Sequence, residues 1–165
     1  MACNSKLGKF HDDVTRISQL NDSSSLLIKQ IDTNYLLSLR SKSKIMFLKF
    51  NIELGNDTLD LDKAKEIDTF IQAYRATDFF TSNISKLRQA LLKQKERMSF
   101  LISDIESGAG ERSEYFTNVK SELDEATQIQ KHAELLEHDY SRFTELFMQF
   151  KPIFDRFTVK HDSIQ

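Results

Sequence analysis

Residues that break helices or cross-link chains are scarce in this sequence. Its 165 residues contain four glycines, one proline, one cysteine and no tryptophan. The single cysteine, Cys3, excludes an intrachain disulfide, and its terminal position excludes a buried thiol nucleophile. Few glycines and one proline leave the backbone few places to turn. Long uninterrupted helices are therefore expected.

Strong net charge and long apolar runs are also missing. The chain is 39% hydrophobic and 29% charged, with a net charge of −2. This composition is too apolar for a disordered chain and too polar for a membrane span, which needs about 20 apolar residues. A dedicated nucleic-acid binder is usually clearly basic. We therefore expect one domain that neither spans a membrane nor binds nucleic acid.

Hydrophobic residues recur at heptad spacing between the glycines. Gly55 and the 107–110 turn separate the helical runs, which predicts an all-α fold: an elongated antiparallel bundle of three long helices. The polar cluster 21–25 favours helix caps and leaves two alternatives open. Either the first helix breaks near 21–24, which gives four helices, or it is continuous. The expected helices cover residues 6–20 and 24–53 (or 6–53), 60–106 and 111–158.

The domain organisation follows from these helices. Residues 1–5 are expected to form a flexible N-terminal tether, residues 6–158 a single helical-bundle domain, and residues 159–165 a frayed C-terminus. The heptad phase changes between residues 75 and 80, which predicts a local bend. Pro152 removes one backbone hydrogen bond and predicts a kink near 148–151.

The short turn at 107–110 predicts the register of the last two helices. Antiparallel partners then have residue numbers that sum to about 217, so that Leu91 faces Ala126 and Ile84 faces Ala133. Large residues thereby oppose small ones, as in a well-packed core. The same register places a basic run beside an acidic run, namely Lys93, Lys95 and Arg97 beside Glu122, Asp124 and Glu125. A second basic run lies toward the end of the second helix, near the acidic start of the third: Arg40, Lys42, Lys44 and Lys49.

Phenylalanines gather where the second helix ends, the third begins and the last ends. Antiparallel folding brings these three regions to one pole of the bundle. Burying one phenylalanine contributes roughly 1.5–3 kcal/mol, so this pole is expected to be the centre of stability. The alternatives are an aromatic core and an aromatic docking surface. The pole comprises Phe47, Phe50, Phe70, Phe80, Phe143, Phe147, Phe150, Phe154 and Phe157.

Sequence motifs for catalysis or metal binding do not occur. The sequence has no His-Glu-x-x-His motif, no Glu-x-x-His pair of the di-iron bundles, no P-loop and no Gly-x-Ser-x-Gly motif. The four histidines, His11, His132, His138 and His161, do not form a ligand set on one helix face. We expect a protein that is not an enzyme and holds neither a metal nor a cofactor.

The N-terminal residues Met1-Ala2-Cys3-Asn4-Ser5-Lys6 resemble the mature start of a bacterial lipoprotein, with Met1-Ala2 in place of the signal peptide. Together with the long charged helices, they resemble the cell-wall-binding lipoprotein family of Gram-positive bacteria. The resemblance implies a lipid on Cys3, a cell-envelope location, membrane contact only through that lipid, and a role as spacer or binding module. The alternative is an ordinary start codon followed by a chance cysteine.

Two further functions fit the helical pattern. A cytoplasmic coiled-coil scaffold or subunit would complete its core with a protein partner or a second copy. It predicts an exposed apolar stripe on the second helix, around Leu26, Leu36, Leu37 and Leu48. A membrane-curvature module of the BAR type would present a basic concave face, which the charge balance supports poorly.

Overall fold

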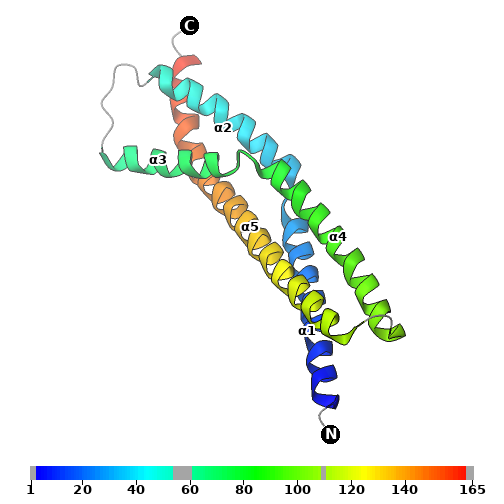
Figure 1. Cartoon of the computed structure of the whole chain (residues 1–165). Coiled ribbons are helices and arrows are strands. Elements are labelled where there is room, and N and C mark those ends of the chain that lie inside the picture. The colour runs from blue at the N-terminus through cyan, green and yellow to red at the C-terminus, as the bar shows by residue number, and fades with distance from the viewer. Residues whose placement is uncertain (1–2, 54–60, 109–110, 163–165) are drawn as a thin grey trace. The chain divides into compact units, whose positions relative to one another are not determined.

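In the computed structural model, the described residues form five helices (Figure 1). The structure describes residues 3–53, 61–108 and 111–162, and no strand occurs among them. The predicted all-α class is therefore confirmed, whereas the predicted number of three or four helices is wrong. The helices are α1 (Cys3–Gln30), α2 (Thr33–Glu53), α3 (Leu61–Ala76), α4 (Phe80–Ser107) and α5 (Arg112–Asp162).

The first helix is continuous through the polar cluster, so the alternative with a break near 21–24 is wrong. Ser24 donates its hydroxyl hydrogen to the carbonyl of Leu20 at 2.7 Å, and Ser25 donates to the carbonyl of Asn21 at 2.8 Å. These bonds reach back one turn along the helix. They satisfy the hydroxyl groups without ending the helix.

The chain breaks instead at residues 31–32. The carboxylate of Asp32 accepts a hydrogen bond from the backbone N–H of Tyr35 at 2.9 Å. The carbonyl of Asp32 also accepts the N–H of Leu36 at 3.0 Å. Asp32 therefore caps the N-terminus of α2 and satisfies one of its free donors.

A second break separates α3 from α4, where the sequence predicts one helix with a change of phase. The backbone N–H groups of Thr77, Asp78 and Phe80 each donate to the carbonyl three residues earlier. This tight turn occupies residues 77–79. The turn lies within the interval 75–80 in which the sequence predicts a local bend. The helix does not bend there but is interrupted completely.

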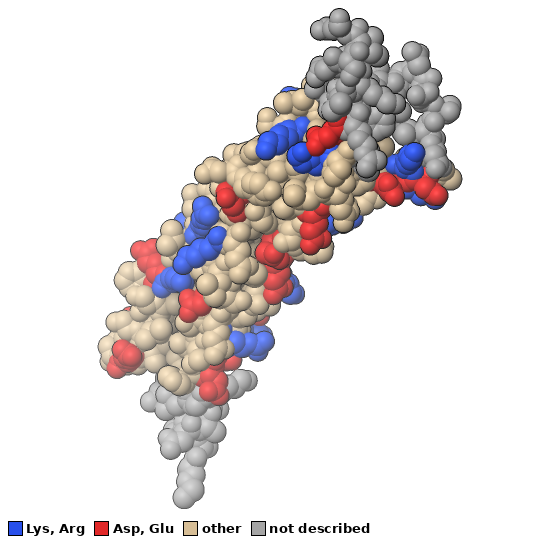
Figure 2. All heavy atoms as spheres, turned by 180° about the vertical axis from the view of Figure 1, so that it is seen from behind, with Lys and Arg blue, Asp and Glu red and all other residues tan. Residues whose placement is uncertain are grey.

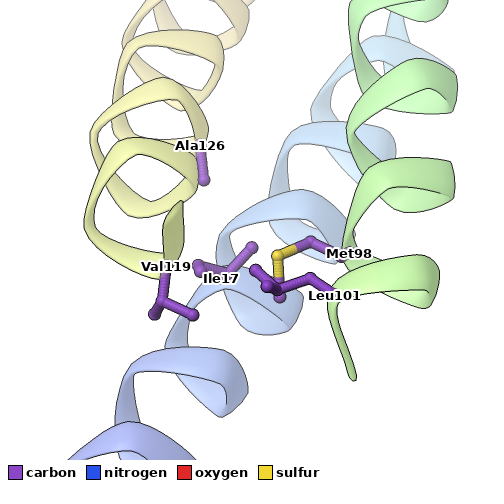
Figure 3. Close-up of a cluster of buried hydrophobic side chains, with 5 residues drawn as sticks. All are labelled: Ile17, Met98, Leu101, Val119 and Ala126. Atoms are coloured by element: carbon purple, nitrogen blue, oxygen red, sulfur yellow. The ribbon is translucent and has the colours of Figure 1, made fainter. Parts of the chain in front are cut away.

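The chain divides into two compact units, and the predicted single helical-bundle domain over residues 6–158 stays a prediction. Unit 1 comprises residues 1–30 and 82–137, and unit 2 comprises residues 31–81 and 138–165. In unit 1, α1, α4 and the first half of α5 run alongside one another (Figure 1). One cluster of buried side chains joins all three helices, and these side chains point toward one another (Figure 3): Ile17, Met98, Leu101, Val119 and Ala126.

The register of α4 against α5 in unit 1 agrees with the predicted sum of about 217. The side-chain amide of Gln94 donates to the carbonyl of Glu122 at 2.7 Å. The four residues expected to oppose one another, Leu91 with Ala126 and Ile84 with Ala133, are all buried. The connection begins at Gly108, which has a φ of 70°. This conformation suits glycine at the end of a helix.

The basic run of α4 has acidic partners on two helices rather than one. Arg97 forms a bidentate pair with Glu122, at 2.6 and 3.0 Å, and also contacts Glu125, as predicted. These hydrogen bonds, first to Glu122 and then to Glu125, raise the pKa of Arg97 above its ordinary value. Lys95 instead pairs with Asp22 of α1 at 3.3 Å. The contact between the two runs is therefore made by Arg97, whereas Lys95 pairs with a third helix.

The two ends of the described chain are helical. α1 begins at Cys3, so residues 3–5 of the expected tether belong to a helix. α5 continues through Pro152 and ends at Asp162, four residues beyond the expected end. The expected kink near 148–151 stays a prediction. The expected turn at Gly55 lies outside the described residues.

Candidate functional site

Unit 2 is built around an aromatic cluster, which consists of Phe47, Phe70, Tyr74, Phe143, Phe147 and Phe150. Phe70 of α3 stacks on Phe150 of α5, with ring centroids 5.2 Å apart, and on Phe143 at 6.0 Å. Phe47 of α2 contacts Phe70 at 5.4 Å. Each ring pair adds about 0.5–1.5 kcal/mol beyond its buried area. The cluster therefore joins all three helices of unit 2.

Most rings predicted for the aromatic pole are not available as a surface. Phe70, Phe80, Phe143, Phe147 and Phe150 are buried, and Phe47 is half-buried. The side chains of Phe50, Phe154 and Phe157 lie outside what the structure describes. The described rings therefore form a core, and a ligand could reach them only at the edges.

One hollow of about 300 Å³ lies beside this core, between α3 and α5. Its lining combines polar and apolar side chains: Glu66, Thr69, Leu146, Gln149 and Phe150. Among the described residues, Phe150 is the only buried ring that lines this hollow, and none of the lining side chains is a cation. The hollow therefore has no set of groups that would select a ligand.

Arg40 attaches α2 to the turn between α3 and α4. Its guanidinium carbon lies 4.5 Å from the ring centroid of Tyr74, and the guanidinium donates to the carbonyl of Tyr74 at 3.0 Å. It also donates to the hydroxyl of Thr77 and to the carboxylate of Asp78. The sequence predicts the acidic start of the third helix as the partner of this basic run. For Arg40 that prediction is wrong, because Asp78 follows the end of α3.

The sequence does not predict these contacts, because the interruption that creates them is only three residues long. Thr77 and Asp78 resemble ordinary members of a helix in the sequence. Their role depends on the interruption at 77–79, which frees backbone carbonyls for a long cationic side chain. The position of the phase change between residues 75 and 80 is the only feature that could have indicated it.

The outer face of α2 is an exposed surface of unit 2 that carries several apolar side chains. It comprises Leu37, Ser41, Lys44, Ile45 and Leu48. Each of these residues lies three or four positions from another member of the set, so all five share one face of the helix. Leu37, Ile45 and Leu48 are 49%, 53% and 57% exposed. The opposite side of α2 carries the buried residues Leu36, Leu39 and Ser43. α2 therefore has apolar residues on both sides but buries only one of them.

The predicted apolar stripe differs from the outer face of α2 at two positions. Leu36 is fully buried and packs into the core, so its inclusion was wrong. Leu26 is exposed but belongs to α1 in unit 1. Leu37 and Leu48 are exposed on α2, as the stripe requires.

Charges around the outer face of α2 are positive. Lys44 lies within it and Lys42 flanks it, and both are exposed. Neither forms an ion pair within the described part of the chain. The face shown in Figure 2 has lysine, arginine, aspartate and glutamate side chains interspersed, without a large field of one sign.

The described residues add no further site at Cys3, in the membrane or for a metal. Cys3 is the first residue of α1, and its side chain lies outside the described ones, so its lipidation stays a prediction. No helix among residues 3–53, 61–108 and 111–162 is long and apolar enough to cross a membrane. Over the same residues, no three His, Cys, Asp or Glu side chains lie close enough to hold a metal.

No family model, curated protein or solved structure matches the chain. Function is therefore inferred from packing and surface chemistry alone.

Proposed function

We propose that this protein is a non-catalytic helical subunit or scaffold that binds a protein partner along the outer face of α2. The observation that carries the proposal is the apolar character of α2 on both of its sides. A helix that is hydrophobic all round is normally buried. Packing within unit 2 covers only the side that carries Leu36 and Leu39.

The spacing of the exposed residues indicates the form of the partner. Leu37, Ser41, Lys44 and Leu48 are spaced four, three and four residues apart and so lie on one line along the helix, with the small Ser41 next to Leu37. A partner helix can place its own apolar side chains between them, as helices do in a groove. Lys42 and Lys44 favour acidic residues beside that apolar stripe, because charge complementarity selects the partner and its orientation.

A photo-crosslinking experiment tests this proposal in cells that make the protein. A photoreactive phenylalanine derivative replaces Ser41 in one variant and Lys86, an exposed residue of α4, in the matched control. We expect a discrete cross-linked product from position 41 and none from position 86. The product should disappear when Leu37→Gln and Leu48→Gln are added. Equal products from both positions, or a product that survives these changes, would contradict the proposal.

A further inference from the structure

A groove between α1 and α4 in unit 1 is the second candidate surface, and α2 plays no part in it. Two hollows open along these helices, one of about 270 Å³ and one of about 320 Å³. Lys95 of α4 borders both. From Val14 to Lys29, the α1 wall extends roughly 22 Å at 1.5 Å per residue. We refer to the two hollows together as the α1–α4 groove.

One end of the groove combines cations with buried apolar side chains. Lys29 of α1 and Arg88 of α4 border the first hollow from opposite helices, and the buried Ile28 and Leu91 also line it. Neither cation forms an ion pair within the part of the chain that the structure describes. Lys29 also lies in the last turn of α1, where a cation compensates the helix dipole. Arg88 lies within α4 and has no such role, so the pair favours an anion between them.

The middle of the groove contains the only ion pair between its walls among the described residues. Asp22 of α1 and Lys95 of α4 are 3.3 Å apart. Asp22 thereby neutralises Lys95, the third cation of the groove. The excess positive charge is therefore confined to the Lys29 and Arg88 end, which gives the groove an electrostatic direction.

A buried polar side chain lies in the second hollow. Asn21 is only 2% exposed, and its side-chain carbonyl has no hydrogen-bond partner among the described residues. It lines the hollow together with Ser18 and Ser99, whose small side chains leave room for close approach. A buried carbonyl without a donor is unfavourable. The carbonyl oxygen has almost no exposed surface, so a polar hydrogen from a bound molecule would satisfy it once a neighbouring side chain of the groove moves aside.

The walls of the groove also expose an apolar side chain to solvent. Leu92 borders the first hollow and is 69% exposed. Val14 and Ile102 border the far end of the second hollow from the two helices. The groove therefore offers cations at one end, a hydrogen-bond acceptor in the middle and apolar contacts on either side of it.

We infer that the α1–α4 groove binds an acidic amphipathic helix of a partner protein, which completes a four-helix bundle with α1, α4 and α5. The carboxylates of that helix lie between Lys29 and Arg88. Its apolar residues pack on Leu91, Leu92 and Ile102, and a polar side chain donates to Asn21. Helices bind to such grooves through residues spaced three and four apart, and four-helix bundles place each helix between two neighbours.

The test uses the full chain and two labelled helical peptides of about 18 residues, which exceeds the length at which isolated helices are marginal. Both have a leucine stripe with one central glutamine. The acidic peptide has two glutamates at one end, and the neutral peptide has glutamines there. Fluorescence anisotropy measures binding. We expect the acidic peptide to bind at least about tenfold more tightly than the neutral one, with a difference that shrinks as salt is added.

Two charge-reversal variants locate the binding site. Lys29→Glu/Arg88→Glu should weaken binding of the acidic peptide at least about tenfold. Lys42→Glu/Lys44→Glu changes the net charge equally, but it alters the outer face of α2 and should leave the affinity within about twofold. All four residues are exposed, and circular dichroism verifies that both variants stay folded.

The same pair of variants separates this inference from the proposed function. Loss of binding only in Lys42→Glu/Lys44→Glu would place the peptide on α2 and overturn the inference, while the proposed function would stand. Equal loss in both variants, no binding to the wild type, or equal affinity for both peptides would also overturn it. Binding of dodecanoate in place of the peptides would exclude a helix as the occupant.

A paramagnetic label on the acidic end of the peptide tests the orientation. We expect it to broaden the backbone amide signals of Lys29 and Arg88, and a label on the other end to broaden those of Val14 and Ile102. Broadening in the reverse pattern would contradict the electrostatic direction. Leu92→Gln should also weaken binding, whereas Phe100→Gln, an equally exposed position on another side of α4, should not.

Discussion

Arg40 lies over the ring of Tyr74 and donates a hydrogen bond to the backbone carbonyl of the same residue, at 3.0 Å. One side chain of α2 thereby recognises both the side chain and the backbone at the end of α3. The side chain of Arg40 is only 18% exposed. Its contacts with Tyr74 and Thr77 are therefore partly shielded from solvent, unlike those of a surface ion pair, whereas its contact with Asp78 is exposed.

Arg40→Ala should destabilise the protein by about 2 kcal/mol, because it removes charge-assisted hydrogen bonds and a cation–π contact together. Arg40→Lys should recover less than half of this loss, because an ammonium group cannot reproduce the planar fork of the guanidinium. Urea unfolding measures both changes. Lys42→Ala, two residues away and exposed, is the control and should shift stability by less than about 0.5 kcal/mol. Similar losses in Arg40→Ala and Lys42→Ala would contradict this account.

The aromatic cluster should dominate the stability of unit 2. Phe70→Ala removes a fully buried ring that contacts Phe47, Phe143 and Phe150. We expect a loss of about 3–5 kcal/mol, the usual range for a buried phenylalanine. Phe79→Ala makes the same chemical change at a ring that is 74% exposed, and it should cost less than about 1 kcal/mol.

Denaturant midpoints of the two variants provide the measurement. Because both substitutions remove the same atoms, the difference between them isolates burial from the change in composition. A Phe70→Ala midpoint close to that of Phe79→Ala would mean that the cluster is not a packed core.

The features that sequence predicts well are those set by neighbours in the chain. The short connection at 107–110 determines how α4 and α5 pair, so that Arg97 and Glu122 could be matched in advance. Large and small residues, such as Leu91 and Ala126, then agree with that register. These inferences depend on geometry within one hairpin and need no knowledge of the other helices.

The features that sequence misses depend on competing local signals or on a third helix. Ser24 and Asp32 are both good capping residues, but Ser24 is buried in unit 1 and bonds within its own helix. Of these two residues, Asp32 is the one that caps a helix. Lys95 could pair with the acidic run of α5 or with Asp22, and the packing of α1 decides between them. Heptad spacing contains no information on either choice.

Asn21 provides a stability test of the α1–α4 groove in the absence of a ligand. Its buried carbonyl has no partner among the described residues, and an unsatisfied buried group costs about 1–3 kcal/mol. Asn21→Leu should therefore raise the free energy of unfolding by about 1 kcal/mol, while it weakens binding of the acidic peptide. The matched control is Asn118→Leu, which makes the same change at an exposed position of α5.

Thermal unfolding and peptide titration of these two variants complete the comparison. Both leucines improve helix propensity equally, so only the difference between the variants reports on burial. If Asn21→Leu were less stable than the wild type, Asn21 would serve the packing of α1 rather than a binding partner.

The raised pKa of Tyr140 should make the protein less stable at alkaline pH. Burial raises the pKa of its hydroxyl group above the ordinary value of 10.0, and the nearby charge of Asp32 acts in the same direction. A hydrogen bond with the backbone of Asp32 opposes these effects in part. The unfolded chain therefore loses this proton at a lower pH than the folded chain. The contribution of Tyr140 to stability is complete below pH 10 and is lost as pH rises through the folded-state pKa.

Tyr140→Phe removes the titrating group and should flatten this part of the pH dependence. The measurement is the unfolding midpoint in denaturant at a series of pH values between neutral and strongly alkaline, for the wild type and for the variant. At neutral pH the variant loses only the hydrogen bond with Asp32, so a modest difference of about 1 kcal/mol is expected there. The two curves should converge above pH 10, because the wild type then loses the advantage of a protonated tyrosine. Parallel curves over the whole range would show that the Tyr140 hydroxyl titrates alike in the folded and unfolded chains.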